Sequence, residues 1–277
     1  MKILYEDKDI LVVNKESGLP VQAGSASRMD LISVLKNYLS QEEKEKSKEE
    51  GKEQDKEPGK KGKEQGKRGR EQDREKGKSG EPYLGIVHRL DQPVEGLLVF
   101  AKNNKAAGDL SRQVQAKADG RSDMRKVYQA MVILKDKAAY DKALKAKHSV
   151  VVLQDYLKRN YAKNMTEIVP EGTRDAKWAE LTYRTLAIWT KEDLGDLPSG
   201  CYGRALLEVH LHTGRHHQIR VQLAGAGLPL DGDRKYGPAG VYYDYNLRLC
   251  SAFLQFRHPA THKKMQFSVK PSFVENP

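Results

Sequence analysis

The stretch HRLDQPVEGLLVFAK, residues 88–102, organises the rest of the chain. Pro93 and Gly96 mark a turn, and the apolar run from Leu97 to Ala101 predicts a buried strand directly after it. Asp91 therefore stands at the start of that strand, beside a histidine and an arginine. An aspartate before a proline-containing turn most simply shapes the turn, and a reactive carboxylate is the second interpretation that these residues leave open.

The chain is strongly basic. Its 277 residues are enough for one large domain or two small ones. The net charge of +11 and the isoelectric point near 9.4 suit a polyanionic partner, most simply a nucleic acid. A basic, solvated surface without a partner is the alternative that composition leaves open.

The cysteines and the apolar segments indicate a cellular compartment. Cys201 and Cys250 are far apart and form no CxxC pair, which argues against a disulfide framework or a zinc knuckle and fits a reducing environment. The first residues contain no apolar run of signal-peptide length, and no stretch approaches the ~20 apolar residues of a membrane helix. We therefore expect a soluble cytoplasmic protein without a membrane partner.

Residues 41–80 differ in composition from everything around them. This tract has no residue of the set AVILMFWYC, so it cannot bury apolar area to offset the entropy of ordering. It holds 14 Lys or Arg and 12 Asp or Glu, so +9 of the net charge of +11 belongs to the rest of the chain. We expect a disordered insertion or a fraying helix, with loose RNA contact as the alternative to a merely solvated tract.

In the remaining sequence, apolar residues recur at every second position in some segments and at every third or fourth position in others. Strands are expected as a pair within residues 3–15, then at 97–101, 126–133, 150–153, 177–186, 205–213, 247–256 and 265–269. Helices are expected with Leu31, Val34, Leu35 and Tyr38 on one face, with Ala107, Leu110 and Val114 on one face, weakly within 135–165, and around Ile219 and Leu223. Ser27 or Asp30, and Asn103 or Asn104, are the expected caps of the first two helices.

Four histidines lie close together in sequence, at positions 210, 212, 216 and 217. Two of them could bind zinc from alternating positions of one strand. No carboxylate or cysteine stands at a recognisable ligand spacing, and the neighbouring Arg215 and Arg220 disfavour a cation. We therefore expect no metal, and we keep a metal-dependent hydrolase as a rival hypothesis. Arg215 and Arg220 could instead bind phosphate or pair with a carboxylate.

Taken together, four motifs resemble those of the RluA family of RNA pseudouridine synthases. They are His88-Arg89-Leu90-Asp91 with Gly96-Leu97-Leu98 and Ala101-Lys102; Lys126-Val127-Tyr128-Gln129-Ala130; residues 213–221 followed by Gly232-Asp233 and Tyr236-Gly237; and residues 249–256 followed by His258-Pro259. The likeness covers nearly all of the chain outside residues 41–80. Each motif is weak by itself, but four in the family's order are specific.

The resemblance implies an enzyme that converts uridine in RNA, ribosomal or transfer RNA, into pseudouridine without metal, cofactor or energy source. Asp91 would act on the ribose of the target uridine, by attack at C1′ or by taking the C2′ proton, and the uracil would detach, rotate and rejoin through C5. Tyr128 would stack on the base and assist loss of the C5 proton. Arg220 would pair with Asp91 and favour its ionised form. The target base must leave its stack first.

The resemblance also implies a fold and a wider set of contacts. We expect a single α+β catalytic domain over residues 1–40 and 81–277, built on a mixed, mostly antiparallel sheet with flanking helices and a central cleft in which Asp91, Tyr128 and Arg220 meet. We also expect a monomer without the small N-terminal RNA-binding domain of many relatives. The expected substrate contacts are Arg89, His88, Arg215, His217, Gln218 and Leu249, with the arginines on phosphates.

One departure from the family pattern lies inside the first motif. Val94-Glu95 replaces the usual Thr-Ser before the glycine, which puts a bulky apolar group and an acid beside the turn of Asp91. This departure leaves a second hypothesis open, namely a catalytically impaired RNA-binding protein on the same fold. The presence of the aspartate, the tyrosine and the arginine together argues against it.

Overall fold

The structure is a computed structural model of the chain. It describes residues 1–23, 29–54, 81–115, 122–194, 197, 201–238 and 246–274. The expected tract at 41–80 therefore lies within the described residues only as far as Gln54.

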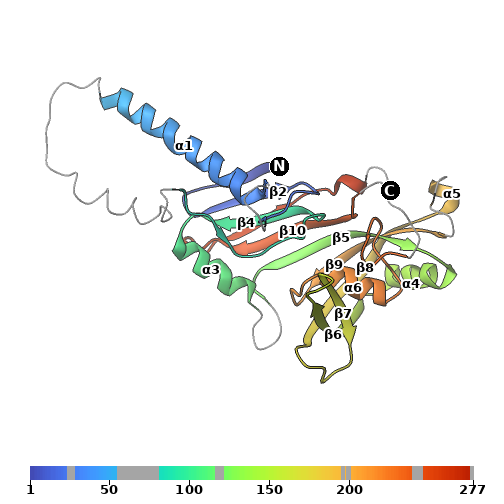
Figure 1. Ribbon diagram of the computed structural model, residues 1–277. Helices are drawn as coiled ribbons and strands as arrows, with labels where there is room; N and C mark the ends of the chain where they lie inside the picture. Colours follow the sequence, from blue (N-terminus) through green and yellow to red (C-terminus); the bar gives the residue numbers. More distant parts are fainter. Residues whose placement is uncertain are drawn as a thin grey trace.

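One 11-stranded sheet forms the body of the protein (Figure 1). Its strands are β1 (Lys2–Glu6), β2 (Ile10–Lys15), β3 (Gly85–Ile86), β4 (Glu95–Ala101), β5 (Arg125–Leu134), β6 (Val151–Asn160), β7 (Met165–Val169), β8 (Lys177–Thr190), β9 (Gly203–Leu211), β10 (Leu249–Arg257) and β11 (Lys264–Ser268). The order is β1-β2-β4-β10-β5-β9-β8-β6-β7, with β3 beside β4 and β11 beside β10. All of these pairs are antiparallel except β4 with β10.

Helices cover both faces of the sheet. They are α1 (Leu31–Gln54), α3 (Asn104–Val114), α4 (Lys137–His148), α5 (Lys191–Leu194), α6 (Gln218–Gly225) and the 3-10 turn η1 (Ser272–Val274). Buried side chains of α1, α4 and α6 belong to one apolar cluster, whereas those of α3 belong to another. Among the described residues, no helix is long and apolar enough to cross a membrane.

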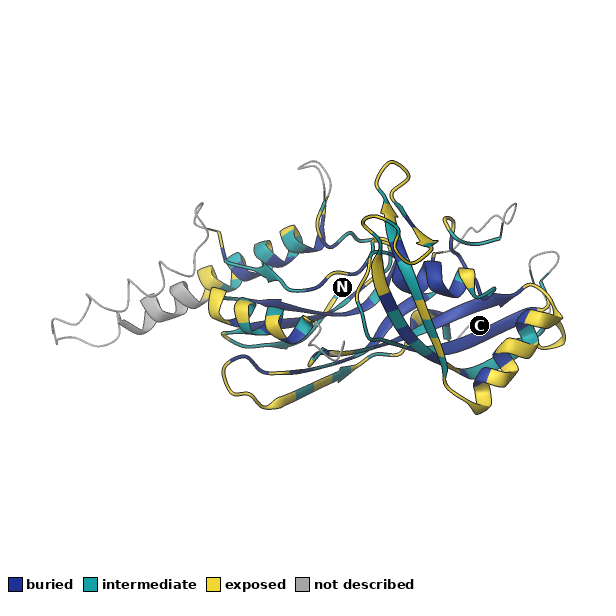
Figure 2. Ribbon diagram, turned by 90° about the horizontal axis from the view of Figure 1, so that it is seen from below, coloured by how far each residue is buried: buried dark blue, intermediate teal, exposed yellow. Residues whose placement is uncertain are grey.

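The middle of the sheet is buried from both sides, as Figure 2 shows. Along β4, Leu98 and Phe100 pack into the cluster with α1, while Leu97 and Val99 pack into the cluster with α3. Successive side chains of a strand point to opposite faces, so a strand between two helical layers has to be apolar at every position. The unbroken apolar run after Asp91 therefore reflects a central strand.

Gly96 lies where β4 and β10 pair in parallel. It pairs with Ser251 of β10 in the parallel contact, and its φ of +113° lies in a region that side chains rarely adopt. A Cβ atom at this position would come within 2.5 Å of the Ser251 carbonyl oxygen. Ser251 in turn pairs with Tyr128 of β5, so Gly96, Ser251 and Tyr128 are neighbours across three adjacent strands.

The predicted α+β class with a mostly antiparallel sheet is confirmed. Asn103 caps α3 by accepting a hydrogen bond from the Ala106 amide, and Asp30 does the same for Ser33 at the start of α1, as the sequence predicted. Two predictions fell short. β6 extends to Asn160, well beyond the short strand expected at 150–153, and its partner β7 was missed.

The charged tract begins inside a helix, because α1 continues to Gln54. This matches the fraying-helix alternative for residues 41–54 more closely than disorder. Residues 55–80 lie outside the described residues, as does most of the polar loop expected at 118–125. The division of the chain into one domain and one inserted tract therefore stays a prediction.

Candidate active site

Asp91 lies in a turn that a second loop holds in place. The Val94 amide donates to the Asp91 carbonyl oxygen at 3.0 Å and closes the turn. From the loop after β2, the Gly18 amide donates to the Gln92 carbonyl at 3.0 Å and the Ser17 hydroxyl donates to the Pro93 carbonyl at 2.7 Å. The carboxylate is therefore carried by a fixed backbone at the N-terminal end of β4.

Lys15, the last residue of β2, is hydrogen-bonded to both of these loops. Its side chain is fully buried, and Nζ donates to the carbonyl oxygens of Glu16, Leu19 and Gln92 at 3.0, 2.8 and 3.1 Å. Burial lowers the pKa of Lys15 to about 8, although the charges of Asp91 and Glu95 oppose that shift. A buried ammonium with three carbonyl acceptors has all three of its N–H groups used.

Arg220 lies in α6, buried behind the carboxylate, and it has two acidic partners. Its Nε and Nη2 atoms bond both oxygens of Asp233 at 2.8 and 2.7 Å, whereas Nη1 is 3.4 Å from Asp91 Oδ2. Burial opposes its charge, but Asp233 and then Asp91 outweigh burial and raise the pKa of Arg220. The guanidinium is therefore anchored by Asp233 and presents its remaining edge to Asp91.

His217 approaches the same carboxylate oxygen. Its Nε2 atom is 3.5 Å from Asp91 Oδ2, and its Nδ1 atom is 2.9 Å from the hydroxyl of Tyr236. Burial, followed by the charge of Arg220, lowers the pKa of His217 to about 2, so the ring is neutral. His217 has a φ of 53° and stacks on His216, with ring centroids 3.7 Å apart.

Tyr128 lies in β5, buried on the face of the sheet that also carries α6. Burial, and then the negative charge of Asp91, raise the pKa of Tyr128, so its phenol stays protonated. Leu249 at the start of β10 pairs with Ala130 of β5 and lines the same cavity as Tyr128.

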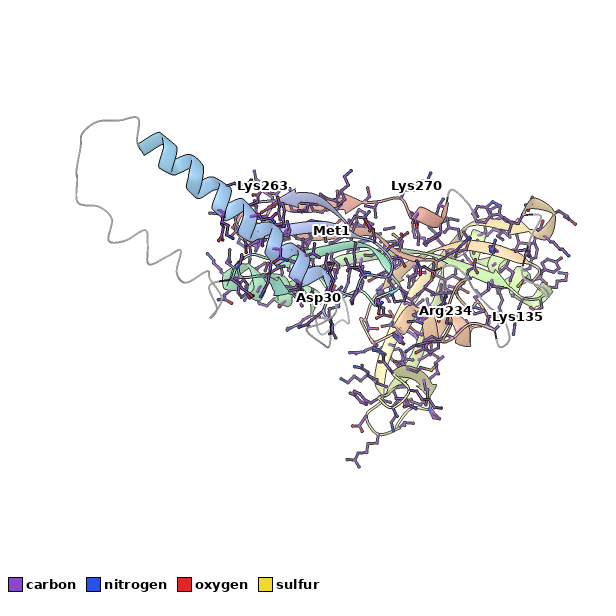
Figure 3. The ribbon with its side chains drawn as sticks, turned by 45° about the horizontal axis from the view of Figure 1, so that its top comes forward. Met1, Asp30, Lys135, Arg234, Lys263 and Lys270 are labelled. Carbon is purple, nitrogen blue, oxygen red and sulfur yellow. The ribbon has the colours of Figure 1, made fainter. Side chains whose placement is uncertain are left out.

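Two adjoining cavities share Asp91, His217 and Arg220. The first has a volume of about 330 Å³ and continues over Arg234, Lys235 and Asn246. The second is smaller and continues over the residues Arg89, Val94, Tyr128, Arg215 and Leu249. Figure 3 shows Arg234 at the junction between the sheet and the hairpin of β6 and β7. Basic groups and the carboxylate of Asp91 therefore border the same cavity. Its volume lies at the lower end of the range for ligand sites.

The structure brings together eight of the nine predicted site residues at these cavities: Asp91, Tyr128, Arg220, Arg89, Arg215, His217, Gln218 and Leu249. Arg89 and Arg215 are exposed at the rim, and Arg215 is held by a bond from its Nε to the Trp178 carbonyl at 2.9 Å. This placement fits the phosphate contacts expected of both arginines.

The substrate contact predicted for His88 is corrected by its position. The ring is buried, and Nε2 accepts the Val99 amide at 3.3 Å. Burial lowers the pKa of His88 to about 3, and its ring contributes to the lining of neither cavity. His88 therefore has a structural role in the interior, where a neutral imidazole fills space beside β4.

The substrate contact predicted for Gln218 stays a prediction. Although Gln218 borders the smaller cavity, its Oε1 accepts from the Thr213 hydroxyl and the Arg215 amide at 2.8 and 2.9 Å. Its Nε2 donates to the Glu180 carbonyl and to Gln222 Oε1 at 3.0 and 2.9 Å. Both N–H groups are thus used, so this side chain shapes the turn before α6.

Lys15, Asp233 and Tyr236 belong to this site and were not predicted as site residues. Asp233 and Tyr236 stood in the sequence as part of a Gly-Asp and Tyr-Gly pattern, but their roles depend on contacts across the fold. Lys15 gave a weaker signal, as a lysine that closes the apolar strand ILVVNK.

The unusual Val94-Glu95 pair divides between two environments. Val94 is buried and lines the smaller cavity beside Tyr128. Glu95 instead accepts hydrogen bonds from the amide and the hydroxyl of Ser272 in η1, both at 2.8 Å. Of this pair only Val94 lines the cavity, whereas the carboxylate of Glu95, although next to the turn in sequence, is bonded to Ser272.

The four clustered histidines have separate partners. His210 contacts Glu208 at 3.0 Å, His212 contacts Thr182 at 3.3 Å, and His216 contacts Thr166 at 2.8 Å. His217 faces Tyr236 and Asp91. Within the described residues, these histidines do not converge on a common point that could hold a metal ion.

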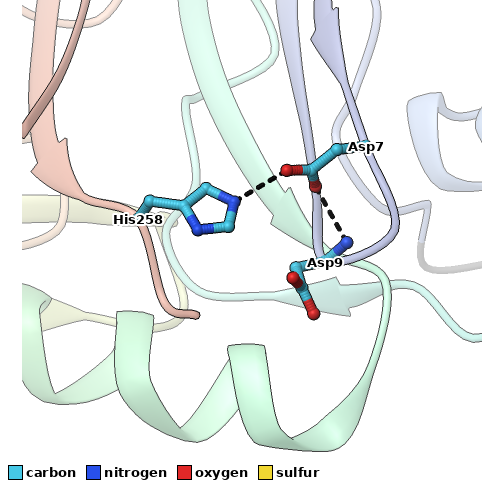
Figure 4. A group of neighbouring side chains, drawn as sticks. All are labelled: Asp7, Asp9 and His258. Atoms are coloured by element: carbon cyan, nitrogen blue, oxygen red, sulfur yellow. Dashed lines mark hydrogen bonds and ion pairs between the residues drawn. The ribbon is translucent and has the colours of Figure 1, made fainter. Parts of the chain in front are cut away.

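A different cluster, Asp7, Asp9 and His258, has donor atoms within 4.8 Å of one another (Figure 4). Asp7 Oδ1 accepts the amides of Asp9 and Ile10 at 2.8 Å, and Oδ2 accepts from His258 at 2.7 Å and from Tyr5 at 3.0 Å. These bonds tie the β1–β2 turn to the end of β10. The lone pairs that a cation would need are already occupied, so the cluster has a structural role.

The sequence model of the RNA pseudouridylate synthase family matches residues 9–225. The chain belongs to this family. It is 34% identical over 192 residues to an uncharacterized RNA pseudouridine synthase of Chloroflexus aurantiacus, a match that covers 68% of this chain and 50% of the relative. It is 29% identical over 239 residues to the ribosomal large subunit pseudouridine synthase D of Nitrosomonas europaea, covering 86% of this chain and 50% of that protein. The chain thus spans about half the length of these two relatives.

Solved structures share the fold of this family member. The human RNA pseudouridylate synthase domain containing 1 superposes with a TM-score of 0.62 at 19% identity, over 98% of this chain and 84% of that one. The human RNA pseudouridylate synthase domain containing 4 gives 0.61 at 20% identity, over 99% and 90%.

Proposed function

We propose that this protein converts uridine in RNA into pseudouridine, with Asp91 as the group that reacts with the ribose. One observation carries the proposal: Asp91, Tyr128 and Arg220, from three segments far apart in sequence, border one cavity. A carboxylate that shapes only its own turn has no need of a buried arginine from α6 and a buried tyrosine from β5. Membership of the family supports the same reaction.

In this proposal the base lies over Tyr128 and Leu249 and the ribose faces Asp91. In one form of the reaction, a carboxylate oxygen bonds to C1′ while the C1′–N1 bond breaks and its electron pair leaves with the uracil. In the other form, the carboxylate takes the C2′ proton as the uracil leaves. In both forms the uracil turns, C5 bonds to C1′, and the C5 proton is lost while N1 gains a proton. The carboxylate is released in the first form, and the C2′ proton returns in the second.

The RNA backbone would cross the rim of the two cavities. Arg89 and Arg215 border the smaller cavity, while Arg234 and Lys235 border the larger one. Cations placed around a pocket of this kind can hold phosphates on either side of a nucleotide that has left its stack. The net charge of +11 agrees with an RNA substrate.

We further propose that the substrate is ribosomal or transfer RNA and that the reaction takes place in the cytoplasm. The relatives from Nitrosomonas europaea and Vibrio cholerae are named as ribosomal large subunit pseudouridine synthases, which makes ribosomal RNA the first to examine. The rival of an impaired RNA-binding protein now rests on Val94, which lines the smaller cavity, because Glu95 is bonded to Ser272.

Pseudouridine mapping in total RNA tests the proposal. A strain that lacks this protein should lose pseudouridine at one or more positions, and the wild-type gene should restore them. Asp91→Asn should restore none, whereas Asp141→Asn, which changes an exposed carboxylate on α4, should restore all. Equal restoration by Asp91→Asn, or no loss in the deletion strain, would refute the proposed function.

A further inference from the structure

We propose that His217 is a positioning residue: Tyr236 holds it as the neutral tautomer with its proton on Nε2, and that proton, with Arg220, engages Asp91 Oδ2 and leaves Oδ1 as the reacting oxygen. This inference rests on the proposed function for the identity of the reaction. It reassigns His217 from substrate binding to control of the carboxylate.

The hydrogen bonds of Tyr236 have a defined direction. Its hydroxyl oxygen accepts the backbone amide of Thr166 in β7 at 2.7 Å, and an amide can only donate. The same oxygen lies 2.9 Å from His217 Nδ1. The phenol therefore has its own proton available for the imidazole.

The position of the proton on the His217 ring follows from the contact of the ring with Asp91. A neutral imidazole carries one N–H, and Arg220 together with burial keeps this ring neutral. Nε2 is 3.5 Å from Asp91 Oδ2, where an unprotonated nitrogen would set its lone pair against a carboxylate oxygen. The proton therefore belongs on Nε2, so Nδ1 accepts and Tyr236 donates. The order of donation is Thr166 amide, Tyr236 hydroxyl, His217 imidazole, Asp91 carboxylate.

The backbone and the neighbouring ring hold His217 in this orientation. His217 has a φ of 53°, in the left-handed region that is unfavourable for a residue other than glycine, so it persists only where the surroundings impose it. His216 stacks on the ring and is itself fixed by the hydroxyl of Thr166, which lies 2.8 Å from His216 Nδ1 and 2.9 Å from the His216 carbonyl. β7 thus fixes His216 directly through the Thr166 hydroxyl, and it fixes His217 indirectly, because the Thr166 amide holds Tyr236.

The consequence for Asp91 is an asymmetric carboxylate. Arg220 Nη1 and His217 Nε2 both approach Oδ2, at 3.4 and 3.5 Å. Among the described residues, no donor is bonded to Oδ1. The side chain is 31% exposed, so the oxygen without a donor has access to the cavity. An oxygen whose lone pairs are not engaged is the better nucleophile or base, so the two donors select which atom reacts.

Tyr236→Phe isolates this arrangement, because Tyr236 lies behind His217 and lines neither cavity. Phenylalanine keeps the ring that lies 5.2 Å from the Arg220 guanidinium and meets His217 edge-on with centroids 5.6 Å apart. Only the hydroxyl is lost. Tyr156→Phe is the matched control, since it removes an exposed hydroxyl that bonds Glu171.

The first measurement is the ¹⁵N spectrum of histidine-labelled protein without RNA, with the His217 signals assigned from a His217→Gln variant. In wild type and in Tyr156→Phe, His217 should be protonated at Nε2 with an unprotonated Nδ1. In Tyr236→Phe, Nδ1 loses its hydrogen-bond donor, so its signal should move further from that of a protonated nitrogen while Nε2 stays protonated beside Asp91. A wild-type His217 protonated at Nδ1, or signals that do not respond to Tyr236→Phe, would overturn the proposal whether or not the protein modifies RNA.

The second measurement is the kinetics of RNA modification. Tyr236→Phe should lower kcat about tenfold with little change in KM, because a lost hydrogen bond to a reacting assembly is worth that much. His217→Gln, which keeps an N–H near the place of Nε2, should retain more activity than His217→Leu. A purely structural hydroxyl would instead lower the melting temperature of Tyr236→Phe and leave kcat per folded molecule unchanged, which would contradict the assignment.

Discussion

Two aspartate–histidine pairs in this protein share one arrangement but differ in how fully the carboxylate is hydrogen-bonded. In the first pair, His258 accepts the amides of Ala260 and Thr261 at Nδ1 and donates from Nε2 to Asp7 at 2.7 Å. In the second pair, His217 meets Tyr236 at Nδ1 and faces Asp91 from Nε2 at 3.5 Å. Both carboxylates therefore receive a neutral imidazole through the same nitrogen.

The difference lies in the other carboxylate oxygen. Asp7 Oδ1 accepts two backbone amides, and although burial opposes its charge, these bonds and His258 hold the pKa of Asp7 below its usual value. Asp91 has no such donors on Oδ1 among the described residues, and its two contacts on Oδ2 are long. A carboxylate with every lone pair engaged stabilises the fold, whereas one with an unengaged oxygen in a cavity can do chemistry.

Exchange of each aspartate for asparagine tests this comparison and should give the largest effect. Asp91→Asn should lower kcat roughly 10⁴-fold or more, as loss of a nucleophile or base generally does, with little change in the unfolding free energy. Asp7→Asn should leave kcat per folded molecule within about twofold and lower the unfolding free energy by about 1–3 kcal/mol, because the amide presents a donor where Tyr5 and His258 donate. Chemical denaturation and single-turnover kinetics measure both quantities.

The comparison would fail if the two variants behaved alike. A stable, inactive Asp7→Asn would give the β1–β2 turn a part in the reaction, and an unstable Asp91→Asn would return Asp91 to a role in the turn. Asp141→Asn is the control for the substitution itself, because its carboxylate is exposed on α4.

Lys15 should give the second largest effect on stability and activity, because its ammonium group is fully hydrogen-bonded and contacts the turn that carries Asp91. Its pKa is about 8 in the folded protein and 10.5 in an unfolded chain. Between these values the unfolded chain holds a proton that the folded protein has released, so the unfolding free energy should rise with pH, by roughly 3 kcal/mol across the window. Over the same window kcat should fall, because a neutral amine has two N–H groups for three carbonyls and the Asp91 loop loosens.

Stability and activity are thus expected to move in opposite directions above pH 8, and denaturation and kinetics at several pH values measure both. Lys15→Met should abolish the rise in stability, whereas Lys2→Met, at an exposed position of β1, should keep it. If kcat stayed constant from pH 8 to pH 10, the Lys15 contacts would not govern the position of Asp91.

Local sequence predicted the elements of the fold well and the site only in part. The apolar run after Asp91 and the caps Asp30 and Asn103 depend on neighbours in the chain, and they were found. Asp233 was missed as a partner of Arg220, because it lies thirteen positions further along the chain and only the fold aligns the bidentate contact. His88 was misassigned for the same reason, since nothing in the sequence distinguishes a buried imidazole from one in a cavity.

The Val94-Glu95 pair provides the smallest effects and separates a cavity residue from its sequence neighbour. Val94→Thr keeps the shape and restores a hydroxyl at a buried position beside Tyr128, which should cost about 1–2 kcal/mol of stability and change KM for RNA severalfold. Glu95→Ala should change the unfolding free energy by no more than about 0.5 kcal/mol and leave kcat and KM within twofold, because its partner Ser272 is exposed.

Steady-state kinetics of the two variants on one RNA distinguish the two positions. A Glu95→Ala variant with a large loss of kcat would mean that η1 communicates with Asp91 along the start of β4. A Val94→Thr variant with unchanged KM would mean that the base does not reach this wall of the cavity. If both variants behave as expected, the replacement of the family's Thr-Ser by Val94-Glu95 makes one wall of the cavity apolar and has no larger effect. Asp91, with its unengaged oxygen, then keeps its proposed role.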